Sequence, residues 1–238
     1  MCFHYALTKE RAEIEIQLQA QWDDDWQPVF HADGFRFPAM PVITEEAPDL
    51  LQYLQWGLIP HWIKSRSEAD VFRAQTLNAR SESIFEKPSF RSSVMHHRCL
   101  VPADGFYEWM DFQKKKYPHF IYQAAQALFC FAGLYANWTD RETGEMRSTY
   151  TILTTEANET VGRIHNQRHR MPVILDPVDY RRWLDPSLEP DAIRALLKPY
   201  AGELRFHAIG KRITSRTDNS DVPETQEPVV YPELALAY

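Results

Sequence analysis

Five short runs rich in aromatic and β-branched residues follow one another closely from residue 98 onward. Short polar turns such as Gln113–Lys116 separate them, and they span Arg98–Pro102, Gly105–Phe112, Tyr117–Gln123, Ala127–Trp138 and Ser148–Thr155. Such runs at this spacing predict strands of an antiparallel meander. Strands do not alternate regularly with helices, so we expect a single α+β domain rather than a doubly wound fold. The predicted domain is β-rich, with a curled antiparallel sheet or barrel-like core and flanking helices.

Other segments carry helix signals. Residues 8–21 predict a short helix with Thr8 as its N-cap. Asp-Pro and Pro-Asp pairs open two further predicted helices, Asp176–Leu184 and Pro190–Leu197. A last strand is expected at Leu204–Ile209. The predicted organisation is one domain over residues 1–217, followed by an acidic, proline-containing segment over 218–238 that lies loosely on the surface or trails from it.

The composition excludes several classes of protein. With 44% hydrophobic and 25% charged residues, the chain is typical of a folded protein. Its longest near-continuous apolar stretch, Ala127 to Ala136, is about half of what a bilayer crossing needs, and no signal-peptide pattern is present. Three separated cysteines without a C-x-x-C pair disfavour a disulfide framework and a zinc finger. We therefore expect a cytoplasmic monomer with no membrane partner, no metal and no cofactor.

The net charge of −7 argues weakly against a nucleic-acid partner, but the charge is uneven. Three windows lack acidic residues and contain several basic ones: residues 87–103, 160–175 and 204–217. If the windows share one face, a negatively charged protein still has a groove that attracts phosphate groups. The alternative is solvated loops with an ordinary bias in composition.

Cys2 is the first candidate for a chemical role. Removal of the initiator methionine, which is usual before a small side chain, would leave an amine and a thiol on one terminal residue. Both groups titrate near neutral pH, with reference pKa values of about 8 and 8.5. Such an aminothiol condenses with an aldehyde to an imine and then closes a five-membered thiazolidine ring. The alternative is a small apolar residue packed under the first strand.

The segment Asn78–Glu82 places three polar residues at alternate positions. If the backbone is extended, Asn78, Arg80 and Glu82 point to the same side, where Arg80 offers a two-pronged grip on a phosphate. The alternative is a helix start capped by Asn78, with an exposed ion pair.

Glu108 lies among aromatic residues in a predicted strand. Desolvation there would raise the pKa of its carboxyl group and suit it to proton transfer near neutrality. A structural ion pair with an arginine is an equal alternative. The neighbouring Trp109 is either a core residue or a stacking platform for an unpaired base.

Two histidines and three arginines gather in residues 163–170. One histidine could act as a general acid or base while Arg168 and Arg170 hold an anion. His165 and His169 are four residues apart, but no zincin pattern surrounds them, so we do not predict a metal site.

Taken together, these motifs resemble the SRAP family, the SOS-response-associated peptidases that crosslink to abasic sites in DNA. The resemblance covers most of the chain: Met1-Cys2, Trp56–Trp62, Asn78–Glu82, Arg98–Trp109, Ala132–Leu134, Thr151–Thr155, His165 and Arg170–Leu175. It implies a β-rich fold special to the family. It also implies a covalent reaction with abasic single-stranded DNA, which is the expected partner.

The resemblance implies roles for individual residues. Cys2 matches the nucleophile exposed by removal of Met1, a step that family members are proposed to carry out themselves. Asn78 matches the residue that holds the new amino terminus, and Glu108 the proton-transfer carboxylate. His165 matches the histidine that assists opening of the sugar ring, with His169 as a rival. With the basic windows added, the expected DNA-binding residues are His4, Trp62, Arg80, Trp109, Arg168, Arg170 and Arg212.

The chain departs from the family pattern in three places. Phe3-His4-Tyr5 replaces the usual Gly-Arg-Phe or Gly-Arg-Tyr, so His4 stands where a phosphate-binding arginine is expected. Residues 166–169 separate His165 from Arg170, where the family often has His-Asp directly before Arg-Met-Pro. Phe37–Pro41 replaces an extended segment with an Asn before Ala-Pro.

Two other functions are weighed against this one. The first is an N-terminal-nucleophile amidohydrolase in which Cys2 attacks an amide, although the missing glycine after Cys2 makes it weaker. The second is a non-catalytic module that binds single strands through Trp62, Trp109 and the basic windows. A papain-like protease is least compatible, because its cysteine lies internally at a helix start.

Overall fold

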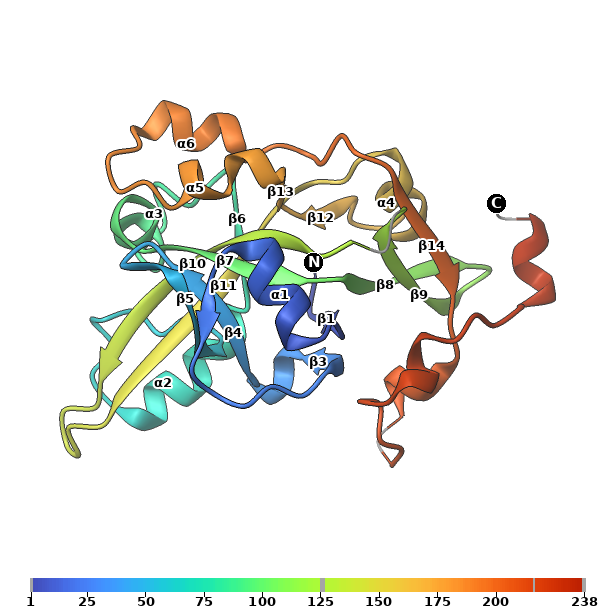
Figure 1. Cartoon of the computed structure of the whole chain (residues 1–238). Helices are drawn as coiled ribbons and strands as arrows, with labels where there is room; N and C mark the ends of the chain where they lie inside the picture. Colours follow the sequence, from blue (N-terminus) through green and yellow to red (C-terminus); the bar gives the residue numbers. More distant parts are fainter. Residues whose placement is uncertain (1, 125–126, 216, 237–238) are drawn as a thin grey trace.

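The computed structural model describes residues 2–124, 127–215 and 217–236, and two β-sheets dominate it (Figure 1). The smaller sheet is antiparallel, with the order β14 (Leu204–Ala208), β9 (Lys115–Gln123), β8 (Gly105–Phe112), β1 (His4–Leu7) and β3 (Val29–Asp33). The larger sheet has the order β12 (Arg170–Pro172), β11 (Met146–Glu156), β10 (Phe129–Thr139), β7 (Arg98–Ala103), β4 (Ala39–Thr44), β5 (Ala47–Trp56) and β2 (Gln21–Trp22). Two short strands extend it: β13 (Ile174–Leu175) beside β10 and β6 (Asn78–Arg80) beside β11.

The α+β class and the barrel-like core are confirmed, but the larger sheet is mixed rather than purely antiparallel. Strand β11 pairs in parallel with β5 and with β6, and β2 pairs in parallel with β5. The expected meander is also interrupted, because β7 and β8 follow one another along the chain and lie in different sheets. Apart from the extended alternative for Asn78–Glu82, the strands before residue 98 were not predicted.

The chain passes from the larger sheet to the smaller one at Asp104. Its backbone N–H donates to the carbonyl of Ala6 (3.0 Å), and its carboxylate accepts from the backbone N–H and the hydroxyl of Thr8, both at 2.6 Å. A Cβ at the next residue, Gly105, would lie 2.1 Å from the ring of Phe120, so a side chain does not fit there. Thr8 therefore fixes this crossing, and the prediction that it caps a helix was wrong.

The space between the sheets is filled by aromatic side chains. Tyr5 on β1 contacts Trp56, Phe131 and Tyr150 of the larger sheet, and its hydroxyl lies 2.8 Å from that of Tyr150. Phe106 on β8 meets Phe131 edge-on. Because β1 contributes to this core and begins two residues after Cys2, Cys2 is anchored inside the fold.

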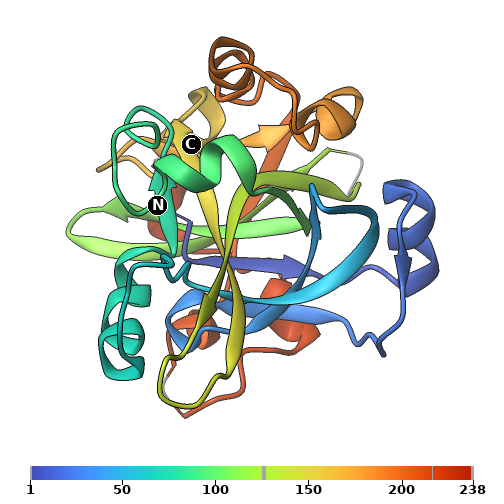
Figure 2. The same ribbon diagram turned by 90° about the vertical axis from the view of Figure 1, so that its left-hand side faces the viewer.

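Short helices surround the sheets (Figure 2). They are α1 (Arg11–Leu18), α2 (Arg66–Phe72), α3 (Arg91–His96), α4 (Glu159–Ile164), α5 (Tyr180–Trp183) and α6 (Pro190–Leu196). The predicted helix over 8–21 is therefore shorter than expected, and Glu10 precedes it without a side-chain cap. The region predicted as one helix over 176–184 is a 3₁₀ turn, Pro177–Asp179, followed by α5. Within the described ranges, no helix is both long and apolar enough to cross a bilayer.

The segment after residue 217 packs against the smaller sheet through specific bonds. Asp221 accepts hydrogen bonds from the backbone N–H groups of Phe30 (2.7 Å) and His31 (3.1 Å). Glu233 accepts one from the Tyr117 hydroxyl, and Leu234 is 1% exposed. These contacts are closer than the loose packing expected from its composition, because the segment supplies acceptors to a sheet edge.

Candidate active site

Cys2 lies two residues before the start of β1 and is fully buried. Its thiol contacts the carbonyl oxygen of His4 (3.5 Å), and the side-chain amide of Asn78 donates to the carbonyl oxygen of Cys2 (2.8 Å). Burial, with a smaller effect from the charge of Glu108, raises the pKa of the Cys2 thiol far above its usual range. The sulfur is therefore a neutral thiol at physiological pH.

Asn78 is held at this point by strand pairing. Residues 78–80 form β6, which runs parallel to β11 with Asn78 opposite Ile152. The extended interpretation of this motif is confirmed for those residues, and the interpretation as a helix start was wrong. Arg80, two residues along the strand, is exposed, while Glu82 lies in the following turn.

Glu108 is the central residue of the candidate site. It lies on β8 between Tyr107 and Trp109 and is only 4% exposed. Burial raises the pKa of its carboxyl group to about 7. At neutral pH the group is therefore divided between its acid and its base forms, which suits it to proton transfer.

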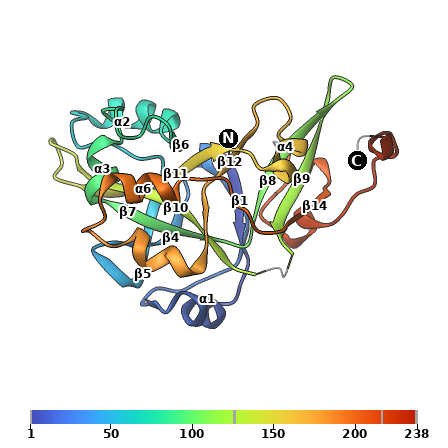
Figure 3. The ribbon, with the colours of Figure 1, turned by 90° about the horizontal axis from the view of Figure 1, so that it is seen from above.

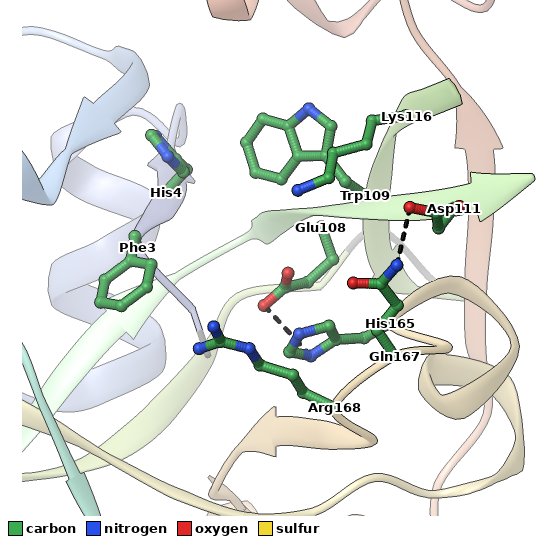
Figure 4. A pocket seen from close by; sticks show the side chains of 9 residues that line it. All are labelled: Phe3, His4, Glu108, Trp109, Asp111, Lys116, His165, Gln167 and Arg168. Atoms are coloured by element: carbon green, nitrogen blue, oxygen red, sulfur yellow. Dashed lines mark hydrogen bonds and ion pairs between the residues drawn. The ribbon is translucent and has the colours of Figure 1, made fainter. Parts of the chain in front are cut away.

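His165 follows the last residue of α4 and faces Glu108 (Figure 4). Its Nδ1 lies 2.8 Å from the backbone carbonyl oxygen of Arg170 and 3.7 Å from Oε1 of Glu108. Burial lowers the pKa of His165 to about 4, so the imidazole is neutral at pH 7. The bond to the Arg170 carbonyl assigns the proton to Nδ1 and leaves Nε2 as an acceptor. The contact with Glu108 is therefore one between a neutral ring and a carboxyl group.

A cavity of about 380 Å³ opens beside Glu108 and His165. Its lining combines aromatic and cationic side chains with these two residues: Phe3, His4, Glu108, Trp109, Asp111, Lys116, His165, Gln167 and Arg168. Figure 4 shows the guanidinium group of Arg168 near the Glu108–His165 pair, with Trp109 and Lys116 on the other side. The cavity thus offers positive charge from Lys116 and Arg168 and a flat aromatic face from Trp109, beside the acids Glu108 and Asp111.

A second cavity, of about 620 Å³, begins at Asn78. Its lining includes Phe72, Arg80 and Lys87. Trp62, 38% exposed, meets the ring of Phe72 edge-on. Asn78 therefore connects the Cys2 backbone to a groove in which Arg80 and Lys87 supply positive charge.

The structure does not bring every expected DNA-binding residue to the two cavities. The guanidinium group of Arg170 is held by both carboxylate oxygens of Glu82 and by the carbonyl oxygen of Thr154. Arg212 is exposed on a 3₁₀ turn and donates to the carbonyl oxygen of Asn219. In the first basic window, Arg98 is fully buried in the larger sheet and does not reach the surface.

His4 lines the first cavity without carrying a positive charge. Its Nδ1 lies 2.8 Å from Nε2 of His31, and its ring meets Trp109 edge-on. Burial lowers the pKa of both His4 and His31 to about 4. His4 is thus a neutral neighbour of Trp109 and lacks the positive charge of the arginine expected at this position.

Comparison with known proteins gives the chain its family. The family model described as SOS response associated peptidase (SRAP) matches residues 1–216. The chain belongs to the SRAP family. It is 39% identical to the abasic site processing protein YoqW of Bacillus subtilis, over 92% of this chain and 97% of that protein. It is 33% identical to the abasic site processing protein HMCES of Gallus gallus, over 78% of this chain and 60% of that protein.

Solved structures agree with this placement. A protein from Bacteroides thetaiotaomicron superposes with a TM-score of 0.90 at 34% identity, covering 96% of this chain and all of that one. A protein from Bordetella bronchiseptica gives a TM-score of 0.76 at 26% identity, covering 88% of this chain and all of that one. The two-sheet arrangement is therefore the SRAP fold.

Sequence reasoning missed four residues that line the first cavity of this SRAP chain: Phe3, Asp111, Lys116 and Gln167. Asp111 and Lys116 face each other across β8 and β9. Lys116 was predicted to lie in a four-residue turn, Gln113–Lys116, and was therefore not paired with Asp111. Gln167 had no comparable signal, because it reaches the site by donating to the carboxylate of Asp111, far away in the sequence.

Within the described ranges, no group of three or more His, Cys, Asp or Glu side chains is arranged to hold a metal ion. Cys2, Cys99 and Cys130 are free and buried.

Proposed function

We propose that this protein processes abasic sites in single-stranded DNA by forming a covalent thiazolidine link through Cys2. The observation that carries the proposal is the position of Glu108, a buried carboxyl group with a pKa of about 7 whose charge acts on the Cys2 thiol. Relatives named as abasic site processing proteins support the choice of substrate. A single strand is favoured because an abasic nucleotide in it enters a narrow site without any cost of unpairing.

The reaction begins with removal of Met1, in which water is added across the Met1–Cys2 peptide bond and methionine is released. In this proposal the site carries out the hydrolysis itself. Asn78 already holds the Cys2 carbonyl oxygen, and Glu108 is the nearby proton-transfer group. The product is a chain whose first residue has both a free amine and a thiol.

The crosslink then forms in two steps. The amine nitrogen bonds to the aldehyde carbon of the opened sugar, and one of its protons passes to the oxygen to give a hydroxyl group. The acid form of Glu108 protonates this hydroxyl group, which leaves as water, and the resulting carboxylate takes the second proton from the nitrogen to give the imine. The Cys2 sulfur next bonds to the imine carbon while its proton passes to the nitrogen. One molecule of water is lost in all. The raised pKa of the thiol fits this order, since a neutral thiol is a poor first nucleophile.

His165 and Arg168 act on the substrate rather than on Cys2. The neutral imidazole of His165 has Nε2 as an acceptor for the sugar hydroxyl that must lose its proton when the closed ring opens. Arg168, which lines the cavity, binds a neighbouring phosphate. Positioning of amine, thiol and aldehyde together accounts for much of the rate.

Intact mass spectrometry after mixing with an abasic oligonucleotide tests the proposal. The expected mass is that of the chain without Met1 plus the oligonucleotide minus one water. Cys2→Ala should abolish this adduct and leave salt-sensitive binding. Cys130→Ala, the same change at another buried cysteine, should form it normally. A normal yield of adduct from Cys2→Ala, or an adduct that still carries Met1, would refute the mechanism.

An amidohydrolase with Cys2 as nucleophile is less compatible with the site. That chemistry needs a thiolate, and burial keeps the Cys2 sulfur protonated. Release of ammonia from glutamine by the purified protein would favour the amidohydrolase over the crosslinking function.

A further inference from the structure

The turn that joins β8 to β9 adopts a backbone conformation that is unfavourable for its residues. Phe112 pairs with Lys115, so Gln113 and Lys114 form a two-residue loop, and their φ angles are +50° and +64°. Loops of this kind favour Asn-Gly because both central residues lie in the left-handed region. The hairpin between β10 and β11 places Gly144 at its positive φ of +73°. At the β8–β9 turn the chain instead keeps a lysine where a glycine would relieve strain.

Three consecutive lysines crowd this strained tip. Lys114, Lys115 and Lys116 are all exposed. Asp111 lies across from Lys116, but its carboxylate accepts a hydrogen bond from Gln167 (2.7 Å). Hydrogen bonds and, less strongly, the nearby charge of Lys115 lower the pKa of the Glu233 carboxyl group. The end of the hairpin therefore has three lysines near two acids, in a chain whose net charge is −7. Figure 3 shows the β8–β9 hairpin extending outward from the body of the molecule.

The positive charge is continuous with the candidate active site. Lys116 lines the cavity, and Figure 4 shows its ammonium group turned toward the cavity beside Trp109. From Glu108 to Phe112 strand β8 advances about 13 Å, at roughly 3.3 Å per residue. A strand of DNA that follows β8 from a reacting sugar at Glu108 would reach the hairpin within a few nucleotides.

We propose that the β8–β9 hairpin is a phosphate-binding arm, with Lys114 and Lys115 contacting the DNA backbone on one side of the reacting nucleotide. The identification of the ligand as single-stranded DNA rests on the function proposed above. The strained turn is retained because lysine at its tip supplies a phosphate contact that glycine would lose. Strained backbone of this kind is characteristic of functional sites.

Equilibrium binding across a range of salt concentrations tests the arm. The probe is a fluorescent single-stranded oligonucleotide with one tetrahydrofuran nucleotide, an abasic analogue that has no aldehyde. Each phosphate contact contributes about 0.7 to the slope of log affinity against log salt for single strands. Lys114→Gly should lower the slope by about 0.7 and raise the melting temperature by about 2–4 °C, because strain is relieved. The double variant Lys114→Ala/Lys115→Ala should lower the slope by about 1.4.

Arg141→Ala is the matched control, since Arg141 is an exposed cation in the β10–β11 hairpin. It should leave the slope unchanged. Unchanged slopes in the two lysine variants, or an equal decrease in Arg141→Ala, would overturn the proposal.

The length of the oligonucleotide on each side of the analogue gives a second test. Two probes are compared, one with a long flank only 5′ of the analogue and one with a long flank only 3′ of it. The lysine substitutions should lower the salt slope for only one of these two probes. An equal response of both kinds would contradict an arm on one side. Because the analogue cannot crosslink, failure of the covalent mechanism would not change these slopes, and unchanged slopes would not affect the covalent mechanism.

Discussion

Arg98 in the larger sheet and Glu108 in the smaller one are both almost completely buried, yet their surroundings treat charge differently. The guanidinium group of Arg98 lies 3.3 Å from a carboxylate oxygen of Glu45 and donates to four backbone carbonyl oxygens, those of Val94, Met95, Trp183 and Asp185. Glu108 instead has a pKa of about 7, because desolvation outweighs its favourable contacts. The larger sheet thus offsets a buried charge with an ion pair and hydrogen bonds. The smaller sheet instead holds a buried acid that can exchange its proton near neutral pH.

Removing the acid of the smaller sheet should have the largest effect on the reaction. Glu108→Gln keeps the shape of the side chain and loses proton transfer, so we expect adduct formation to slow by about 10²–10⁴-fold. The rate is measured by stopping the reaction with abasic oligonucleotide at fixed times. Glu189→Gln, an exposed change before α6, should react at the normal rate. A normal rate in Glu108→Gln would make Glu108 a structural residue.

Removing the charge of the larger sheet should instead affect stability. Arg98→Met leaves Glu45 buried without its partner, and we expect a loss of about 3–5 kcal/mol in the free energy of unfolding. Urea denaturation measures this loss. Arg66→Met removes an exposed pair with Glu145 and should cost less than about 1 kcal/mol. If Arg98→Met also slowed crosslinking per folded molecule, the division between the two sheets would not hold.

The raised pKa of Glu108 also predicts a dependence of stability on pH. The folded state binds the proton of the Glu108 carboxyl group more tightly than the unfolded state does. The contribution of this proton to the free energy of unfolding is therefore complete below pH 4.5 and is lost as pH rises through about 7. Glu108→Gln has no proton to lose. Its stability relative to the unmodified chain should therefore increase between pH 4.5 and pH 8, by up to about 3 kcal/mol. Urea denaturation at both pH values measures the change, and a constant difference would mean that Glu108 titrates normally.

Local patterns in the sequence predicted the strands from residue 98 onward because aromatic and β-branched residues there alternate with short turns. They did not predict β5, which joins the larger sheet partly through parallel pairing with β11 and β2. Such pairings join segments far apart in the chain, so no local pattern records them. Distant contacts also explain why two arginines were misjudged. Arg98 and Arg170 lie in windows that were interpreted as basic surface. In the structure, Arg98 pairs with Glu45 and Arg170 pairs with Glu82.

The residues that separate His165 from Arg170 show how the two halves of the site are joined. Asn166 accepts a hydrogen bond from the backbone N–H of Asp111 (3.1 Å) and donates to its carbonyl oxygen (2.8 Å). Asp111 is three residues along β8 from Glu108. Asn166 therefore fastens the loop that carries His165 to the strand that carries Glu108, which keeps the 3.7 Å contact between their side chains.

Loss of this fastening should give the smallest of the effects on the reaction. Asn166→Ala removes both bonds while leaving every group that is proposed to touch the substrate, so we expect crosslinking to slow by about 5–10-fold through poorer alignment. The rate should be compared at several pH values, because a loosened contact with His165 should also move the pH at which Glu108 gives half of the maximal rate. Asn219→Ala, at an exposed position, serves as the control. If Asn166→Ala were less stable but kept both the rate and the pH profile, the loop would hold the fold together without positioning His165.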